Sequence, residues 1–137
     1  MDVKKGERVL DLACGEGFFS RRFARLGAKV IGVDIAKELI DIANSSFIKG
    51  GGAKGDGGFV AKKSLTARGP LPFEKGEVEF HVASADSIPF VQDDSIDKAA
   101  IVLALQNIEN ARGVINESSR VLKKHGKLFI VLNHPAF

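Results

Sequence analysis

The residues best suited to chemistry lie between Arg8 and Asp34, where a glycine turn is flanked by acidic side chains. The segment Val9-Leu-Asp-Leu-Ala-Cys-Gly-Glu-Gly17 is an apolar run that ends in a turn. Glycine lets the backbone turn sharply and lets a ligand approach it closely. A helix that begins after such a turn presents free N–H groups to a carboxylate or a phosphate. The pattern therefore predicts a ligand site at this turn.

Two acidic residues further along the chain indicate what the ligand is. Asp34 ends the next apolar segment, where a carboxylate can accept hydrogen bonds from both hydroxyls of a ribose. Asp86 lies in a later loop, where its carboxylate can accept a hydrogen bond from the exocyclic amine of adenine. Together with the glycine turn, these carboxylates predict a pocket for an adenosine that carries a charged tail.

The elements that must position these residues alternate along the chain. Apolar and β-branched runs predict strands at 8–13, 29–33, 77–82, within 97–105 and at 127–132. Helical spacing of apolar residues predicts helices at 18–26, 36–47 and 110–124. Gly27 is expected to cap the end of the first helix, and Gly126 the end of the third. Strands and helices that alternate with short connections are typical of a right-handed parallel βαβ layout.

A glycine-rich, basic insertion at 49–75 interrupts this alternation. Six of its first ten residues are glycine, and the segment carries six Lys or Arg against two acidic residues. Long loops in compact domains are usually functional or disordered. We therefore expect a flexible surface loop. A lid over the site and binding of RNA or another anionic partner are the alternatives.

The length and amino-acid composition are those of one ordinary globular domain over residues 1–137. The chain is 45% hydrophobic, 27% charged and carries a formal net charge of +3, which permits an anionic partner without requiring one. A single cysteine, Cys14, excludes an intramolecular disulfide. The N-terminus lacks the apolar stretch of a signal peptide, and the longest apolar run is far shorter than the about 20 residues that span a bilayer. We expect a cytoplasmic protein with no membrane partner.

With these motifs in place, the chain resembles the class I S-adenosylmethionine-dependent methyltransferases, and among them the small quinone-biosynthesis group. The matching segments follow the family's order and cover residues 9–17, 30–35, 85–90, 97–107 and 121–132. The resemblance implies direct displacement of a methyl group from S-adenosylmethionine to an acceptor, which leaves S-adenosylhomocysteine. A small-molecule acceptor is implied, although the residues do not identify it.

The resemblance also implies which positions bind the cofactor. The methionine part would be held by Asp11 and by a turn made of Ala13, Cys14, Gly15, Glu16 and Gly17. The ribose would be held by Asp34, and the adenine by Ile35, Asp86 and Ser87. The methyl-transfer side would be lined by Leu103 through Gln106.

No matching position supplies a defined catalytic group, and no metal site is expected. Ala13 stands where many relatives have the first glycine of the turn, and Gln106 and Asn107 stand where many have histidines. His134 follows the last predicted strand and is the candidate general base, since an imidazole can take a proton near neutral pH. Cys14 has no basic residue nearby in sequence to lower its pKa, so we expect no nucleophilic role for it.

The family fold is a Rossmann-like α/β sandwich whose sheet has strand order 3-2-1-4-5-7-6. The chain ends after its fifth predicted strand, so we expect an open, mainly parallel five-stranded sheet with order 3-2-1-4-5. The fifth strand would then be an exposed edge. A homodimer could cover that edge, and a fragment of a longer protein would end in the same way.

Two other functions stay open from the residues alone. A cofactor-binding core without its own catalysis fits the absence of the last two strands, where much of the family's substrate specificity resides. A nicotinamide-dependent oxidoreductase would carry the fingerprint G-x-G-x-x-G, but Ser20 stands at the third glycine position.

Overall fold

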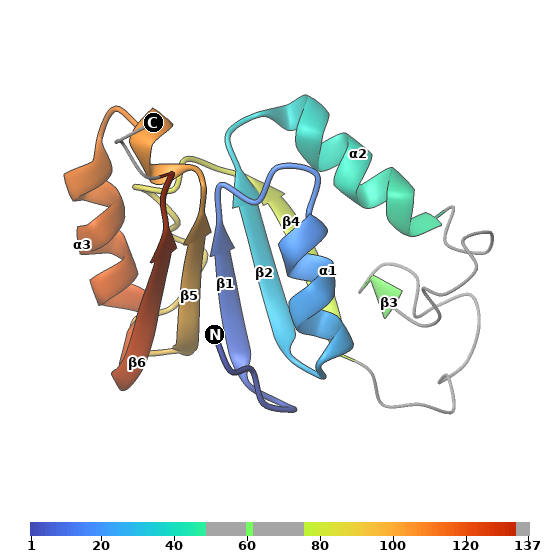
Figure 1. The fold of residues 1–137 in the computed structure, drawn as a ribbon, viewed down its shortest axis with the longest axis horizontal. Coiled ribbons are helices and arrows are strands. Elements are labelled where there is room, and N and C mark those ends of the chain that lie inside the picture. The colour runs from blue at the N-terminus through green and yellow to red at the C-terminus, as the bar shows by residue number, and fades with distance from the viewer. Residues whose placement is uncertain (49–59, 62–75, 134–137) are drawn as a thin grey trace.

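A parallel β-sheet runs through the centre of the protein, in a computed structural model that describes residues 1–48, 60–61 and 76–133 (Figure 1). The strands are β1 (Arg8–Leu12), β2 (Lys29–Asp34), β3 (Val60–Ala61), β4 (Glu77–Val82), β5 (Ile96–Val102) and β6 (Leu122–Val131). The helices are α1 (Phe18–Arg25), α2 (Lys37–Ile48) and α3 (Ala111–Val121), with a 3-10 turn, η2, at Leu105–Asn107.

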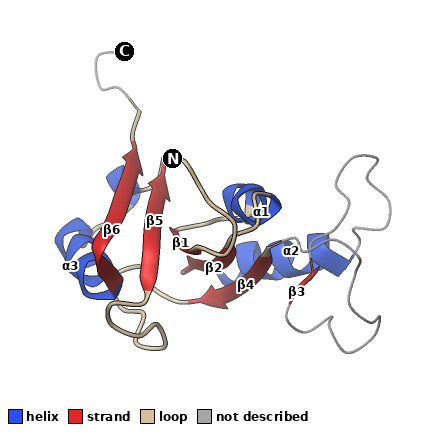
Figure 2. Cartoon of the chain, turned by 90° about the horizontal axis from the view of Figure 1, so that it is seen from below, coloured by secondary structure: helices blue, strands red, loops and turns tan. Residues whose placement is uncertain are grey.

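The strand order is β3-β4-β2-β1-β5-β6. Without β3, this is the predicted order 3-2-1-4-5, which the structure confirms. β3 is an addition that the sequence did not predict, a two-residue strand that pairs parallel to β4 from within the insertion. The other residues of the 49–75 insertion lie outside the described part of the chain. Figure 2 shows β6 at one end of the sheet and β3 at the other.

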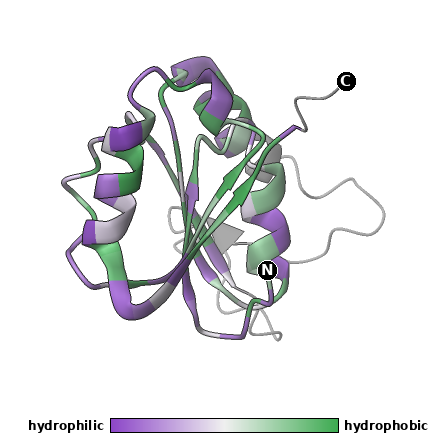
Figure 3. Ribbon diagram, turned by 60° about the vertical axis from the view of Figure 1, so that its left-hand side comes forward, coloured by the Kyte–Doolittle hydropathy of each residue, from purple (hydrophilic) through white to green (hydrophobic). Residues whose placement is uncertain are grey.

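The sheet is covered on both faces, which explains why the central strand β1 is mostly apolar. Val9, Leu10 and Leu12 of β1 are fully buried. One core contains Leu10 and Leu12 together with Val114 and Val121 of α3, and a second contains Val9 with Ala24 of α1. Strands buried on both faces are usually continuous apolar runs, and in β1 the buried Asp11 is the exception. Figure 3 shows the hydrophobic strand segments lying between the helices.

The parallel register brings the chemistry-bearing residues to one edge of the sheet. Leu12 pairs with Val33, and Asp34 pairs with Val82, so β1, β2 and β4 end close together. The ladder between β1 and β2 is extended by the Cys14 amide, which donates to the Val33 carbonyl at 2.9 Å. Residues that follow these strands therefore meet at their carboxyl ends.

The predicted end of the third helix is wrong. α3 ends at Val121 rather than Lys124, and Leu122 already has an extended backbone with φ −71° and ψ 135°. The chain leaves the helix here because Leu122 pairs with Ile96 and packs against the core, whereas Lys123 and Lys124 are exposed.

Gly126 is consequently not a helix cap but part of β6, where the ladder to β5 is irregular. The corresponding prediction for Gly27 is confirmed, since it follows the last residues of α1 with φ +94°. A left-handed glycine of this kind commonly ends a helix. Among the described residues, no helix is both long and apolar enough to cross a membrane.

The glycine at position 32 leaves room for the ring of Phe80 between β2 and α1. A Cβ at Gly32 would lie 2.7 Å from Phe80 Cδ1 and 3.0 Å from Ser20 Oγ. We expect Gly32→Ala to lower the free energy of unfolding by about 1–3 kcal/mol, because the ring must move from a packed site. Urea denaturation would measure this cost. In a double-mutant cycle, Phe80→Leu should relieve part of it, and strictly additive effects would contradict the proposed steric cause.

Candidate functional site

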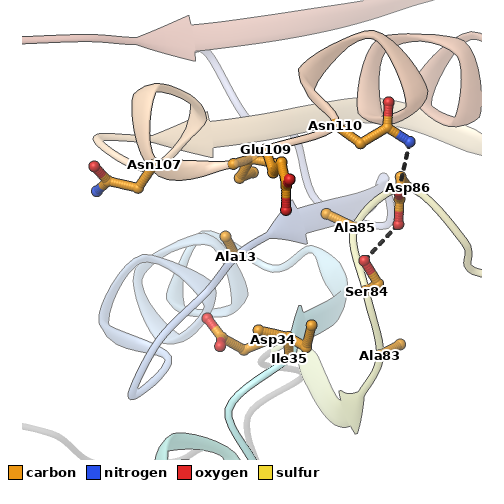
Figure 4. Close-up of a pocket in the computed structure, with 11 residues that line it drawn as sticks. Ala13, Asp34, Ile35, Ala83, Ser84, Ala85, Asp86, Asn107, Glu109 and Asn110 are labelled. Carbon is orange, nitrogen blue, oxygen red and sulfur yellow. Dashed lines mark hydrogen bonds between the residues drawn. The ribbon is translucent and has the colours of Figure 1, made fainter.

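A cavity of about 280 Å³ opens at the carboxyl ends of the strands. It is built from the residues after β1, β2 and β4 and from the segment that joins η2 to α3 (Figure 4). Its lining consists of Ala13, Asp34, Ile35, Ala83, Ser84, Ala85, Asp86, Asn107, Ile108, Glu109 and Asn110. Ligands of open parallel α/β sheets bind at this edge, so the cavity is the candidate site.

The turn after β1 borders the cavity and adopts a backbone that glycine favours. Ala13, Gly15 and Gly17 have φ values of +56°, +55° and +77°. The left-handed conformation costs a residue with a Cβ about 1–2 kcal/mol. Ala13 therefore holds a strained conformation at the position where the resemblance implies a glycine, and its methyl group lines the cavity.

Asp34 fixes the position of this turn relative to the start of α2. One carboxylate oxygen accepts the backbone N–H of Gly15 at 2.8 Å, and the other accepts that of Ala36 at 2.9 Å. The side chain is nearly buried, with an exposed fraction of 9%, yet it lines the cavity. A carboxylate offers about four acceptor positions, so each oxygen can accept another hydrogen bond from a ligand.

Asp86 is held in a comparable way by two polar neighbours. Its Oδ1 accepts a hydrogen bond from the Ser84 hydroxyl, and its Oδ2 accepts one from Asn110 Nδ2 at 2.7 Å (Figure 4). The bond from Ser84, followed by the bond from Asn110, lowers the pKa of Asp86. The group is thus an anion that can accept a hydrogen bond at the cavity wall.

The loop that carries Asp86 is anchored to α3 by Arg120 and Glu117. The Arg120 guanidinium donates to the carbonyls of Ile88 at 3.1 Å and Val91 at 2.9 Å. Glu117 accepts the Ile88 backbone N–H at 2.9 Å and pairs with Arg120 at 2.7 Å, and the hydrogen bond from Arg120 lowers the pKa of Glu117. The hydrogen bonds of the Arg120 guanidinium and its ion pair with Glu117 hold the loop against α3.

Asn110 joins the Asp86 loop to the first turn of α3, and two matched variants separate its roles. Its Oδ1 accepts the Gly113 backbone N–H at 3.0 Å and so caps the helix. We expect Asn110→Ala to lower the free energy of unfolding by about 1 kcal/mol, whereas Asn110→Ser should retain most of the cap without placing a second carboxylate beside Asp86. Urea denaturation of both variants would measure this. Equal destabilisation would contradict the cap as the source and implicate the bond to Asp86.

Asp11 lies deeper than the cavity wall. Its carboxylate is 2% exposed and accepts a hydrogen bond from Ser20 Oγ at 2.5 Å. Burial raises the pKa of Asp11 to about 6, although the hydrogen bonds from Ser20 act in the opposite direction. Burial also raises the pKa of the Cys14 thiol, which agrees with the expectation that Cys14 is not a nucleophile.

The structure brings only some of the predicted site residues to the cavity. Ala13, Asp34, Ile35 and Asp86 line it. The predicted residues outside the lining are Asp11, Cys14, Gly15, Glu16, Gly17, Ser87, Leu103 and Gln106.

Several of these other residues have local structural bonds instead. The Ser87 amide donates to the Ser84 carbonyl at 3.0 Å, and Gln106 Nε2 donates to the Leu103 carbonyl at 3.1 Å. Leu103 has φ +56° and is 46% exposed. His134 lies outside the described residues. No cofactor contact has been tested for any of these positions, so their roles stay predictions.

The segment before α3 contributes cavity residues that sequence reasoning missed. Asn107 is the last residue of η2, and Glu109 and Asn110 lie between η2 and α3. Only Asn110 carried a usable signal, since asparagine before a helical run is typical of an N-cap. Nothing in the sequence pattern shows that this segment folds back over the ends of β1 and β4.

Comparisons with known proteins agree with this geometry. A family model described as a methyltransferase domain matches residues 10–130. The ubiquinone biosynthesis O-methyltransferase of Xanthomonas oryzae pv. oryzae is 28% identical over 125 residues, which are 91% of this chain and 42% of the relative. The demethylmenaquinone methyltransferase of Tropheryma whipplei is 29% identical over 136 residues, 98% of this chain and 46% of the relative.

Solved structures show the same likeness. The crystal structure of a putative methyltransferase from Bacillus halodurans has 27% sequence identity and a TM-score of 0.70, and the match covers 98% of this chain and 48% of that one. The chain therefore spans less than half the length of the relatives it matches.

Proposed function

The chain belongs to the methyltransferase domain family, in the class I S-adenosylmethionine-dependent group related to quinone-biosynthesis enzymes, and we propose that its cavity binds S-adenosylmethionine for methyl transfer. The family model and the two curated relatives are methyltransferases, so they give the oxidoreductase alternative no support. The proposed acceptor is a small molecule, since both curated relatives are named for steps of ubiquinone or menaquinone synthesis.

The observation that carries the proposal is the fixed carboxylate of Asp34 at the cavity wall. Both of its oxygens are oriented by backbone N–H groups and retain acceptor capacity, which suits the two hydroxyls of a ribose. Beside it, Ile35 is 74% exposed and lines the cavity, which suits an apolar contact with the face of adenine. Asp86 supplies a third fixed acceptor, suited to the adenine amine.

The residues present fit the adenosine part of S-adenosylmethionine in polarity. Ala13, Ala83 and Ala85 line the cavity with small side chains and leave space between the polar groups. When bound, the cofactor would supply a methyl group already activated on a sulfonium. The protein then has to bind and orient the donor, and a dedicated base is optional.

Calorimetric titration with S-adenosylmethionine and with S-adenosylhomocysteine tests the proposal. We expect both compounds to bind with one site per chain, and binding of neither would overturn it. A cofactor-binding core without catalysis of its own is the second candidate, because the chain spans less than half the length of its relatives. Turnover by the chain alone, with a labelled methyl group and quinone-type acceptors, would exclude that candidate.

A further inference from the structure

Glu109 is a carboxylate in the cavity that the protein itself does not use. It lies between η2 and α3, and its side chain points into the cavity toward the turn that carries Ala13 (Figure 4). Within the described part of the chain, it makes no hydrogen bond or ion pair. Asp34 and Asp86, by contrast, each accept two hydrogen bonds from protein groups.

The ionisable side chains of the cavity wall are all acidic. Among the residues that the structure describes, the ionisable ones in the lining are Asp34, Asp86 and Glu109, and none is Lys, Arg or His. Hydrogen-bond donors already stabilise the charges of Asp34 and Asp86, which leaves the charge of Glu109 available to a ligand. A cavity of this kind favours a cation over an otherwise identical neutral molecule.

Methyl transfer removes the positive charge on the sulfur of the cofactor. The acceptor's lone pair forms the new bond to the methyl carbon, and the electrons of the broken sulfur–carbon bond stay on sulfur. The sulfonium cation thereby becomes a neutral thioether, and the acceptor loses its proton to solvent. The product therefore carries one positive charge fewer than the donor.

We propose that Glu109 is a specificity-determining residue, which makes the cavity prefer the cationic methyl donor to its neutral product. The inference rests on the proposed function and extends it to exchange of product for donor. Attraction by Glu109 strengthens donor binding and disappears once the methyl group has left. Because Glu109 is exposed, water and salt screen this attraction to about a threefold to tenfold preference.

The test compares the unaltered chain with Glu109→Gln, which keeps the shape of the side chain and removes its charge. Titration calorimetry would give the Kd of S-adenosylmethionine and of S-adenosylhomocysteine for each protein at about 20 mM salt. We expect the variant to bind the donor about threefold to tenfold more weakly and the product unchanged. The difference should shrink at about 300 mM salt.

Glu77→Gln is the matched control, since Glu77 begins β4 at the opposite end of the strand from the cavity. It makes the same change in net charge and should leave both Kd values unchanged. An unchanged ratio of the two Kd values in Glu109→Gln would overturn the inference, as would an equal change in the control. If the unaltered chain bound neither compound, the proposed function would fail first, and the inference with it.

Discussion

The free energy of unfolding is expected to fall by about 3 kcal/mol between acidic and neutral pH because of Asp11, and Asp11→Asn should abolish this fall. Asp11 is 2% exposed, and burial raises its pKa from 3.8 to about 6. A carboxyl group that titrates at a higher pH in the folded state binds its proton more tightly there than in the unfolded chain. The native state therefore loses stability as Asp11 ionises.

The direction of this effect is opposite to that of Asp97 and Glu117. Below pH 3.8, Asp11 is protonated in both states and costs nothing. As the pH rises toward 6, the folded state retains a proton that the unfolded state has released, so the free energy of unfolding falls. Asp97 and Glu117 have lowered pKa values, and their contributions are present at neutral pH and lost in acid.

Urea denaturation of both proteins at several values between about pH 3.5 and pH 7.5 isolates the contribution of Asp11. The stability of Asp11→Asn minus that of the unaltered protein should rise by about 3 kcal/mol across this range. Asp41→Asn, at an exposed acid of α2, should show no such rise. A difference that stays flat with pH would mean that burial does not raise the pKa of Asp11 in the folded state.

The sequence predicts most strand and helix ends to within one residue, but it places the boundary between α3 and β6 wrongly. β6 begins at Leu122, five residues before the predicted start at Lys127. β4 matches its predicted bounds, because its residues alternate and its ends are marked by loops. The end of α3 depends instead on a tertiary contact, the pairing of Leu122 with Ile96, which overrides the lysines and glycine that would favour a longer helix. Local signals locate an element, and packing decides where it stops.

The same distinction applies to the cavity. Asp34 and Asp86 are predictable because each follows a strand whose end must lie at the ligand edge of a parallel sheet. Glu109 is not, because its position depends on how the segment after η2 folds across that edge. No periodicity or spacing in one sequence records such a path.

The largest functional effect is expected for Asp34→Asn, which should weaken binding of S-adenosylhomocysteine by about 100-fold. Hydrogen bonds to a charged group contribute about 1.5–3 kcal/mol, and a loss of about 2.7 kcal/mol corresponds to that factor. The substitution also turns the new amide NH₂ toward a backbone donor, because Gly15 and Ala36 each give their N–H to one of the two oxygens. The turn that borders the cavity should therefore shift as well.

Calorimetry below the unfolding temperature would measure this loss, and circular dichroism would confirm that the variant is folded. Ile35→Ala provides a second measurement that does not depend on the fold, because Ile35 is 74% exposed and its truncation removes little buried surface. It should weaken binding by about tenfold if adenine packs on Ile35, through loss of apolar contact. Unchanged affinity in both variants would place the ligand elsewhere, whereas a loss in Asp34→Asn alone would retain the ribose contact and reject the adenine contact at Ile35.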